Sequence, residues 1–136
     1  MLEYLPAPED VIAVRIAGTV GREELESLID RMLRSLDERE RTHVFVEVAQ
    51  LAGLELEGMG EHLRRSLPVM GRLRKFGRIA VVADQSWLRW ASRVESAVLP
   101  FVSYEVCTPE EREGAWRWVL GEQASPRAQT PSGLRG

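Results

Sequence analysis

One glycine-flanked acidic turn combines the residue types and spacing of a possible ligand site. The turn reads Glu55-Leu56-Glu57-Gly58-Met59-Gly60. It follows a strand predicted over Val44–Val48 and precedes a predicted helix. Glycines at such a helix entrance let backbone amides approach a ligand closely. The turn lacks the hydroxyl or basic side chain that a phosphate site needs. We therefore expect it to indicate the fold more than a reaction.

Two further polar residues are candidates. Asp84 ends a buried strand predicted over Arg78–Asp84, on the side where ligands of open α/β sheets bind. It can equally fix the loop before Ser86. Cys107 stands just before a predicted helix N-terminus, where a thiol can become reactive, although a buried structural cysteine is the commoner case.

Known catalytic and cofactor motifs do not occur. His43, His62 and Cys107 lack the spacing of a zinc site, so we assign no metal. The segment from Gly58 to Gly60 lacks the third glycine of a dinucleotide fingerprint, and neither a phosphate-binding loop nor a G-x-S-x-G elbow occurs. The sequence therefore predicts no cofactor and favours a protein that is not an enzyme.

Composition indicates a cytoplasmic globular domain. The chain has 136 residues, 44% hydrophobic and 29% charged, with a single cysteine and a net charge of −3. No apolar run approaches the roughly 20 residues of a membrane span, and the N-terminus does not read as a signal peptide. The basic segment from Arg64 to Arg78 has only Phe76 nearby to stack on a base, so we expect no nucleic-acid partner.

The elements that must position these residues alternate between strands and helices. Expected strands are Leu2–Leu5, Val11–Ala17, Val44–Val48, Arg78–Asp84 and Val102–Cys107. Expected helices are Arg22–Arg39, a Pro68-kinked segment between Met59 and Phe76, a Ser86-capped helix carrying Trp87 and Trp90 inward, and a Thr108-capped helix ending at Leu120.

This order predicts an α/β fold. We expect a mostly parallel sheet of four to five strands with an antiparallel N-terminal edge strand, βα superhelical crossovers and about four helices. The domain is expected over residues 1–121. A disordered tail is expected over 122–136, which is rich in Pro, Ser and Gly and has little to bury.

Two segments resemble a known family. Residues 46–60, V-E-V-A-Q-L-A-G-L-E-L-E-G-M-G, resemble without a gap the segment L-D-L-S-x-V-x-x-x-D-S-S-G-L-G of anti-sigma-factor antagonists with the SpoIIAA-like (STAS) fold. Residues 78–90, R-I-A-V-V-A-D-Q-S-W-L-R-W, are similar to poorly characterised bacterial SpoIIAA-like proteins, also described as STAS/SEC14-like. The resemblance covers residues 1–120.

The resemblance implies a regulatory module that binds a protein partner. In the switch proteins a serine of the D-S-S-G turn is phosphorylated, but Leu56 and Glu57 stand at the two serine positions. Serine phosphorylation of this turn is therefore excluded. The expected partner-binding residues are Glu55, Leu56, Glu57, Gly58, Met59 and Gly60. Self-association is the alternative to a separate protein partner.

The likeness to SEC14-type domains implies an alternative, a carrier or sensor of a lipid or another small apolar ligand. Its pocket would lie between the Met59–Phe76 and Trp87–Leu99 helices, lined by Leu63, Met70, Asp84, Trp87 and Trp90. The same Met and Trp stripe is commonly core packing. Peripheral membrane contact is not expected, because the kink at Pro68 shortens any continuous basic face.

Overall fold

One mixed sheet of five strands, in the order β1-β2-β3-β4-β5, organises the protein. The computed structural model describes residues 1–58, 61, 65, 75–98 and 104–126. The strands are β1 Leu2–Tyr4, β2 Val11–Val20, β3 Thr42–Leu54, β4 Phe76–Ala83 and β5 Glu105–Cys107. β1 pairs antiparallel to β2, and all other neighbouring strands are parallel. The predicted α/β fold with an antiparallel N-terminal edge is confirmed.

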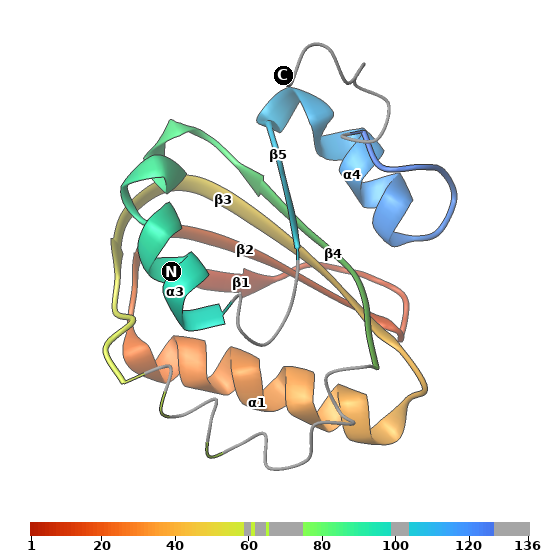
Figure 1. The fold of residues 1–136 in the computed structure, drawn as a ribbon, viewed down its shortest axis with the longest axis horizontal. Coiled ribbons are helices and arrows are strands. Elements are labelled where there is room, and N and C mark those ends of the chain that lie inside the picture. Colours follow the sequence, from red (N-terminus) through yellow and green to blue (C-terminus); the bar gives the residue numbers. More distant parts are fainter. Residues whose placement is uncertain (59–60, 62–64, 66–74, 99–103, 127–136) are drawn as a thin grey trace.

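Helices cover both faces of this sheet. They are α1 Arg22–Glu38, α3 Ala91–Val98 and α4 Arg112–Val119, with 3-10 turns η2 Gln85–Arg89 and η3 Pro109–Glu111. In Figure 1, α1 and α4 lie on opposite sides of the sheet. Most residues of β2, β3 and β4 are therefore buried or half-buried, which explains why their sequences are mainly apolar, although Arg15 of β2 is exposed.

The core follows the alternation of side chains along each strand. Ile12 and Val14 of β2 pack with Leu28 of α1 on one face. Phe45 of β3 meets the edge of the Trp116 ring of α4 on the other face, with the ring centroids 5.0 Å apart. Neighbouring residues of one strand thus belong to different halves of the core.

The start of the final helix agrees with its prediction. The Glu111 carboxylate accepts a hydrogen bond from the Thr108 N–H at 2.9 Å, and Pro109 occupies the first helical position. The chain makes one 3-10 turn there before α4 begins. α4 ends before Gly121, as the sequence predicts.

Strand β3 is longer than the predicted Val44–Val48. A glycine after a predicted strand predicts a loop, and this interpretation of Gly53 is wrong, because Gly53 lies within β3. Gln50 adopts a left-handed φ of 51° and forms a bulge that lets the strand continue to Leu54. Gly53 pairs with Thr19 of β2. A Cβ added at Gly53 would lie 3.2 Å from the Thr19 Cγ2, so this glycine permits close strand approach instead of marking a turn.

The prediction that Ser86 caps the helix carrying the tryptophans is also wrong. Asp84 occupies the cap position, because its carboxylate accepts the Ser86 N–H, and the segment begins as the 3-10 turn η2. The predicted Met59–Phe76 helix falls almost wholly outside the described residues, although Phe76 itself begins β4. The predicted start of the last strand at Val102 lies outside them too.

The first residues of the predicted tail pack against the domain. Ser125 is buried, with 5% of its surface exposed, and its hydroxyl donates to the Glu105 carboxylate of β5 at 2.6 Å. The remaining tail residues, 127–136, lie outside the described part of the chain.

A buried histidine links β3 to β4. The His43 Nδ1 accepts the Arg78 N–H at 2.8 Å, so the neutral ring carries its proton on Nε2. Burial, and after it the charge of Arg78, holds the pKa of His43 below its ordinary value of 6.5. The ring lies close to Gly77, where an added Cβ would overlap it.

Gly77→Ala should lower the free energy of unfolding by about 1–3 kcal/mol, the usual range for overpacking. The methyl group would force the His43 ring away and break its bond to the Arg78 N–H. Urea denaturation of both proteins measures the difference. In a His43→Ala background the same glycine substitution should cost much less, whereas an equal cost would show that the ring is not the obstacle.

Candidate functional site

The turn predicted to bind a partner lies at the carboxyl end of β3. The Glu55 N–H donates to the Val20 carbonyl at 3.1 Å, which extends the pairing of β2 and β3 into the turn. Leu56 is half-buried against the apolar cluster around Trp87, whereas Glu57 and Gly58 are exposed. The apolar residue therefore anchors the turn and leaves its acidic side chains in solvent.

This turn lies over the N-terminus of α1. A Cβ added at Gly58 would stand 3.1 Å from the Arg22 guanidinium, and one added at Gly21 would stand 3.5 Å from the Glu55 carboxylate. Gly58 also has a left-handed φ of 79°, which a side chain would strain. Glycine is therefore favoured at this position by both backbone conformation and space.

Acidic side chains collect at this end of the molecule. Glu23, Glu55 and Glu57 are exposed there, and we call these three residues the acidic rim. The nearby Arg22 is already paired with Glu26, its Nε 2.9 Å from the Glu26 Oε2. The α1 dipole favours negative charge at this helix end, so the rim is compatible with stability as well as with recognition.

Sequence reasoning missed the residue that fixes this helix end. The Glu24 carboxylate accepts the Gly21 N–H at 3.1 Å and the Leu2 N–H at 3.0 Å, which ties α1 to the edge strand β1. A glutamate three residues after the N-cap is the signal of a capping box. The spacing from Gly21 to Glu24 fits this signal. It was not recognised, because the residue at the cap is a glycine and not a serine or threonine.

Asp84 clamps β4 to the bulge of β3. Its Oδ2 accepts the Gln50 N–H at 2.9 Å, and its Oδ1 accepts the Ser86 N–H and the Ser86 hydroxyl. The Ser86 Oγ in turn accepts the Leu51 N–H at 2.8 Å. The N–H groups of Gln50 and Leu51, which are consecutive in the bulge, thus both donate hydrogen bonds to the segment of Asp84 and Ser86.

These bonds also explain the electrostatics of Asp84. The hydrogen bond from the Ser86 hydroxyl, followed by that from the Gln50 N–H, holds the pKa of the Asp84 carboxyl below its ordinary value. Both carboxylate oxygens accept internal hydrogen bonds. Of the two roles open to Asp84 from its position, the geometry favours fixing the loop before Ser86.

The tryptophans expected to line an apolar pocket lie next to the turn. Trp87 is buried, with 7% of its surface exposed, and Trp90 packs half-buried against the same cluster that holds Leu56. The two predicted sites therefore share one apolar cluster. Met59, Gly60, Leu63 and Met70 lie outside the described residues.

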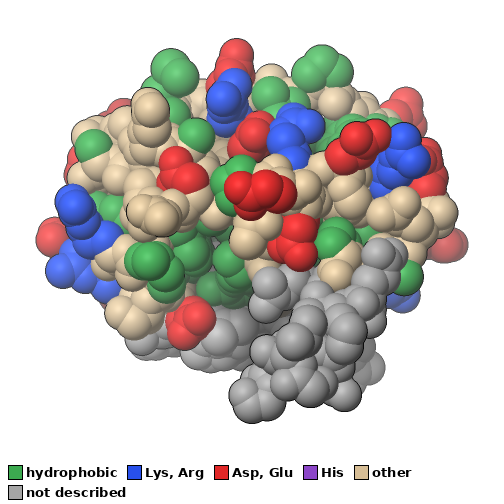
Figure 2. Space-filling model, turned by 90° about the horizontal axis from the view of Figure 1, so that it is seen from above, with side chains coloured by type: hydrophobic (Ala, Val, Ile, Leu, Met, Phe, Trp, Pro, Cys, Tyr) green, Lys and Arg blue, Asp and Glu red, His purple; other side chains and the backbone are tan. Residues whose placement is uncertain are grey.

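The described residues show mixed surface charge. In Figure 2, acidic and basic side chains are interspersed on the face shown, with hydrophobic side chains between them. Within the described ranges, no three His, Cys, Asp or Glu side chains are grouped to hold a metal ion. None of the helices that these ranges contain is long and apolar enough to span a membrane.

Comparison with known proteins decides the family. A family model described as SpoIIAA-like matches residues 11–120. The chain belongs to the SpoIIAA-like family. The match covers every strand except β1 and extends through α4, so the resemblance seen in the turn and in the Arg78–Trp90 segment is confirmed. No curated protein matches this SpoIIAA-like chain.

Two solved structures share the SpoIIAA-like fold. One is the anti-sigma factor antagonist SpoIIAA in its unphosphorylated form, 13% identical, with a TM-score of 0.56, covering 87% of this chain and 97% of that one. The other is an uncharacterised protein of the DUF3478 family from Shewanella loihica PV-4, 20% identical, with a TM-score of 0.51, covering 88% and 92%. At these identities the likeness shows the fold alone.

Asp84→Ala should lower the free energy of unfolding at pH 7 by about 0.5–2 kcal/mol, the usual cost of losing a cap. The folded pKa of Asp84 is depressed, so its contribution is present above the unfolded pKa of 3.8 and is lost as the pH falls through the folded value. The difference between wild type and variant should shrink in acid. A pH series of urea denaturations measures it, and a difference independent of pH would contradict the clamp.

Proposed function

We propose that this SpoIIAA-like domain is a non-catalytic, cytoplasmic regulatory module that binds a protein partner. The proposed binding surface is the turn of Glu55, Leu56, Glu57, Gly58, Met59 and Gly60 together with the segment that the sequence predicts to follow it as a helix. The observation that carries the proposal is the exposure of Glu55 and Glu57 on a turn whose backbone is held by β2 and whose Leu56 is anchored in the core.

A rigid support of this kind suits recognition. Side chains presented on a fixed backbone lose little conformational entropy when a partner binds. The family match adds support, because SpoIIAA, which shares this fold, is described as an anti-sigma factor antagonist. That description is of the other protein, and it reaches this chain only as part of the proposal.

The mechanism of regulation must differ from serine phosphorylation. Residues 55–58 contain no hydroxyl, and Glu57 carries a constant negative charge where a serine stands in the switch proteins. The acidic rim adds Glu23 beside it. We infer that the partner offers a basic surface, and that binding is controlled by the amount of partner rather than by modification of this turn.

An apolar contact can complete the surface. Leu88 of η2 is 76% exposed and directly follows Trp87, which packs in the same apolar cluster as Leu56 of the turn. A single exposed leucine is common on protein surfaces and carries no weight alone. We propose that it adds an apolar contact to the charged surface, since protein interfaces usually contain an apolar centre.

Glu57→Lys should weaken capture of the partner while leaving thermal stability nearly unchanged, because the side chain is exposed and makes no contact that the fold needs. Tagged wild-type and variant proteins expressed in the host, followed by crosslinking and quantitative mass spectrometry, measure the captured proteins. Glu40→Lys is the matched control, since Glu40 is an exposed acid just before the amino end of β3.

A partner retained by the Glu40 variant and lost by the Glu57 variant supports the turn surface. Equal capture by all three proteins would exclude it. Leu88→Ser is a second variant that tests the apolar contact, and it should reduce capture of the same partner without reducing stability.

A carrier of a small apolar ligand is the second candidate. The Trp90 Nε1 and the Tyr104 hydroxyl are buried and have no hydrogen-bond partner among the described residues. Burial, and after it the charge of Glu95, raises the pKa of Tyr104. Buried polar atoms of this kind can meet a polar group of a bound molecule, and the proposed ligand would then lie beside Trp90 and Tyr104.

Native mass spectrometry of protein purified from its own host tests the carrier. A co-purifying apolar molecule, released under denaturing conditions and depleted in Trp90→Ala, is the expected result. A bare monomer or dimer would count against the carrier and leave the interaction proposal untouched, because that proposal rests on the exposed turn.

A further inference from the structure

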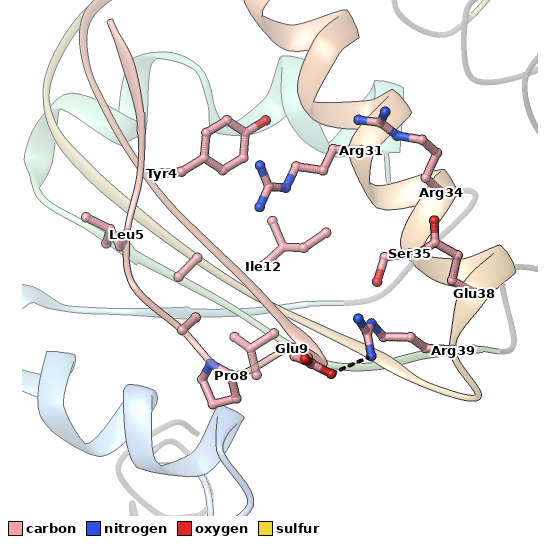
Figure 3. Close-up of a pocket in the computed structure, with 13 residues that line it drawn as sticks. Tyr4, Leu5, Pro8, Glu9, Ile12, Arg31, Arg34, Ser35, Glu38 and Arg39 are labelled. Atoms are coloured by element: carbon pink, nitrogen blue, oxygen red, sulfur yellow. Dashed lines mark hydrogen bonds and ion pairs between the residues drawn. The ribbon is translucent and has the colours of Figure 1, made fainter.

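A cavity of about 370 Å³ lies beside the C-terminal half of α1, at the opposite end of this helix from the acidic rim. Figure 3 shows α1 side chains on one wall, residues of β1 and the β1–β2 connection on the other, and Ile12 of β2 between them. The volume is at the lower end of the roughly 300–1,000 Å³ typical of ligand pockets. Its size therefore suits a small molecule.

Two exposed arginines of α1 line this cavity. Arg31 and Arg34 are three residues apart and share one side of the helix. The Arg31 guanidinium stands 4.2 Å from the centroid of the Tyr4 ring, which holds it in place through a cation–π contact. Arg34 has no ion pair with any described residue. A guanidinium fork in this state suits a carboxylate or a phosphate.

The rest of the lining limits the ligand. The Arg39 Nη1 lies 3.4 Å from the Glu9 Oε2, so these two charges offset each other. Glu38 also lines the cavity, which leaves a net charge of +1 from three arginines and two glutamates. The C-terminal end of α1 adds partial negative charge. A polyanion such as a nucleic acid is therefore disfavoured, whereas one anionic group is accommodated.

We propose that this cavity binds a small polar organic anion that carries one carboxylate or phosphate group. Arg31 and Arg34 hold the anionic group, and Glu38 accepts hydrogen bonds from hydroxyl or ammonium groups elsewhere on the ligand. The exposed lining is mainly polar, which fits a hydroxylated or amino-bearing body better than a hydrocarbon. The Tyr4 contact keeps one guanidinium in position before binding, so less entropy is lost when the complex forms.

Glucose 6-phosphate is the probe, because it joins an anionic group to a hydroxylated body, and inorganic phosphate and glucose present each half alone. Isothermal titration calorimetry should show tighter binding of glucose 6-phosphate than of either half. Arg34→Gln should weaken it about tenfold, the typical effect of losing one charged hydrogen bond. Amide shifts in NMR spectra should map to residues 4–13 and 31–39.

Arg117→Gln is the matched control, since Arg117 is an exposed arginine on α4 that pairs with Glu113 at 2.8 Å. It should leave the affinity unchanged. Glucose 6-phosphate binding no tighter than inorganic phosphate, or equally weakened by both substitutions, would overturn the proposal. So would Arg34-dependent binding to vesicles containing phosphatidylglycerol without any response to the sugar phosphate, because the anion would then belong to a lipid surface.

Discussion

Burial of the central parallel strands on both faces is the constraint on which the rest of this structure depends. Parallel strands cannot be joined by tight hairpins, so a connection such as α1, between β2 and β3, crosses a face of the sheet and covers it. Almost every side chain of the central strands must then be apolar. Glu47 is the exception in the middle of β3, and Arg112 at the start of α4 pairs with it at 2.9 Å. The covering helix thus supplies the charge that the strand requires.

The two proposed binding surfaces lie toward opposite ends of α1, the helix that covers one face of the sheet. α1 has 17 residues, which gives a length of roughly 25 Å at 1.5 Å per residue. The acidic rim of Glu23, Glu55 and Glu57 lies at its N-terminus, and the cavity with Arg31 and Arg34 lies beside its C-terminal half. These two proposed binding surfaces share no residue.

Much of the fold could be predicted because its signals are local. Alternating strands and helices, the capping box from Thr108 to Glu111, and the match of the turn to the SpoIIAA-like pattern are all read from neighbouring residues. The candidate site was predicted less completely. Its turn was identified, but the clamp of Asp84 and Ser86 and the hydrogen bond from the Leu2 N–H to Glu24 join segments far apart in the chain, and no spacing rule reports them.

Residue types and their periodicity were enough to indicate the SpoIIAA-like family, the mostly parallel pairing of the strands and the absence of a serine from the turn. Tertiary structure alone decided where β3 ends. A glycine such as Gly53 looks like a loop signal in isolation, and only the approach of Thr19 makes it a strand residue. It likewise decided that Arg31 and Arg34 face a cavity, since that cavity exists only where α1 meets the β1–β2 connection. Contacts between distant segments depend on how those segments pack together, and the spacing of neighbouring residues does not predict that packing.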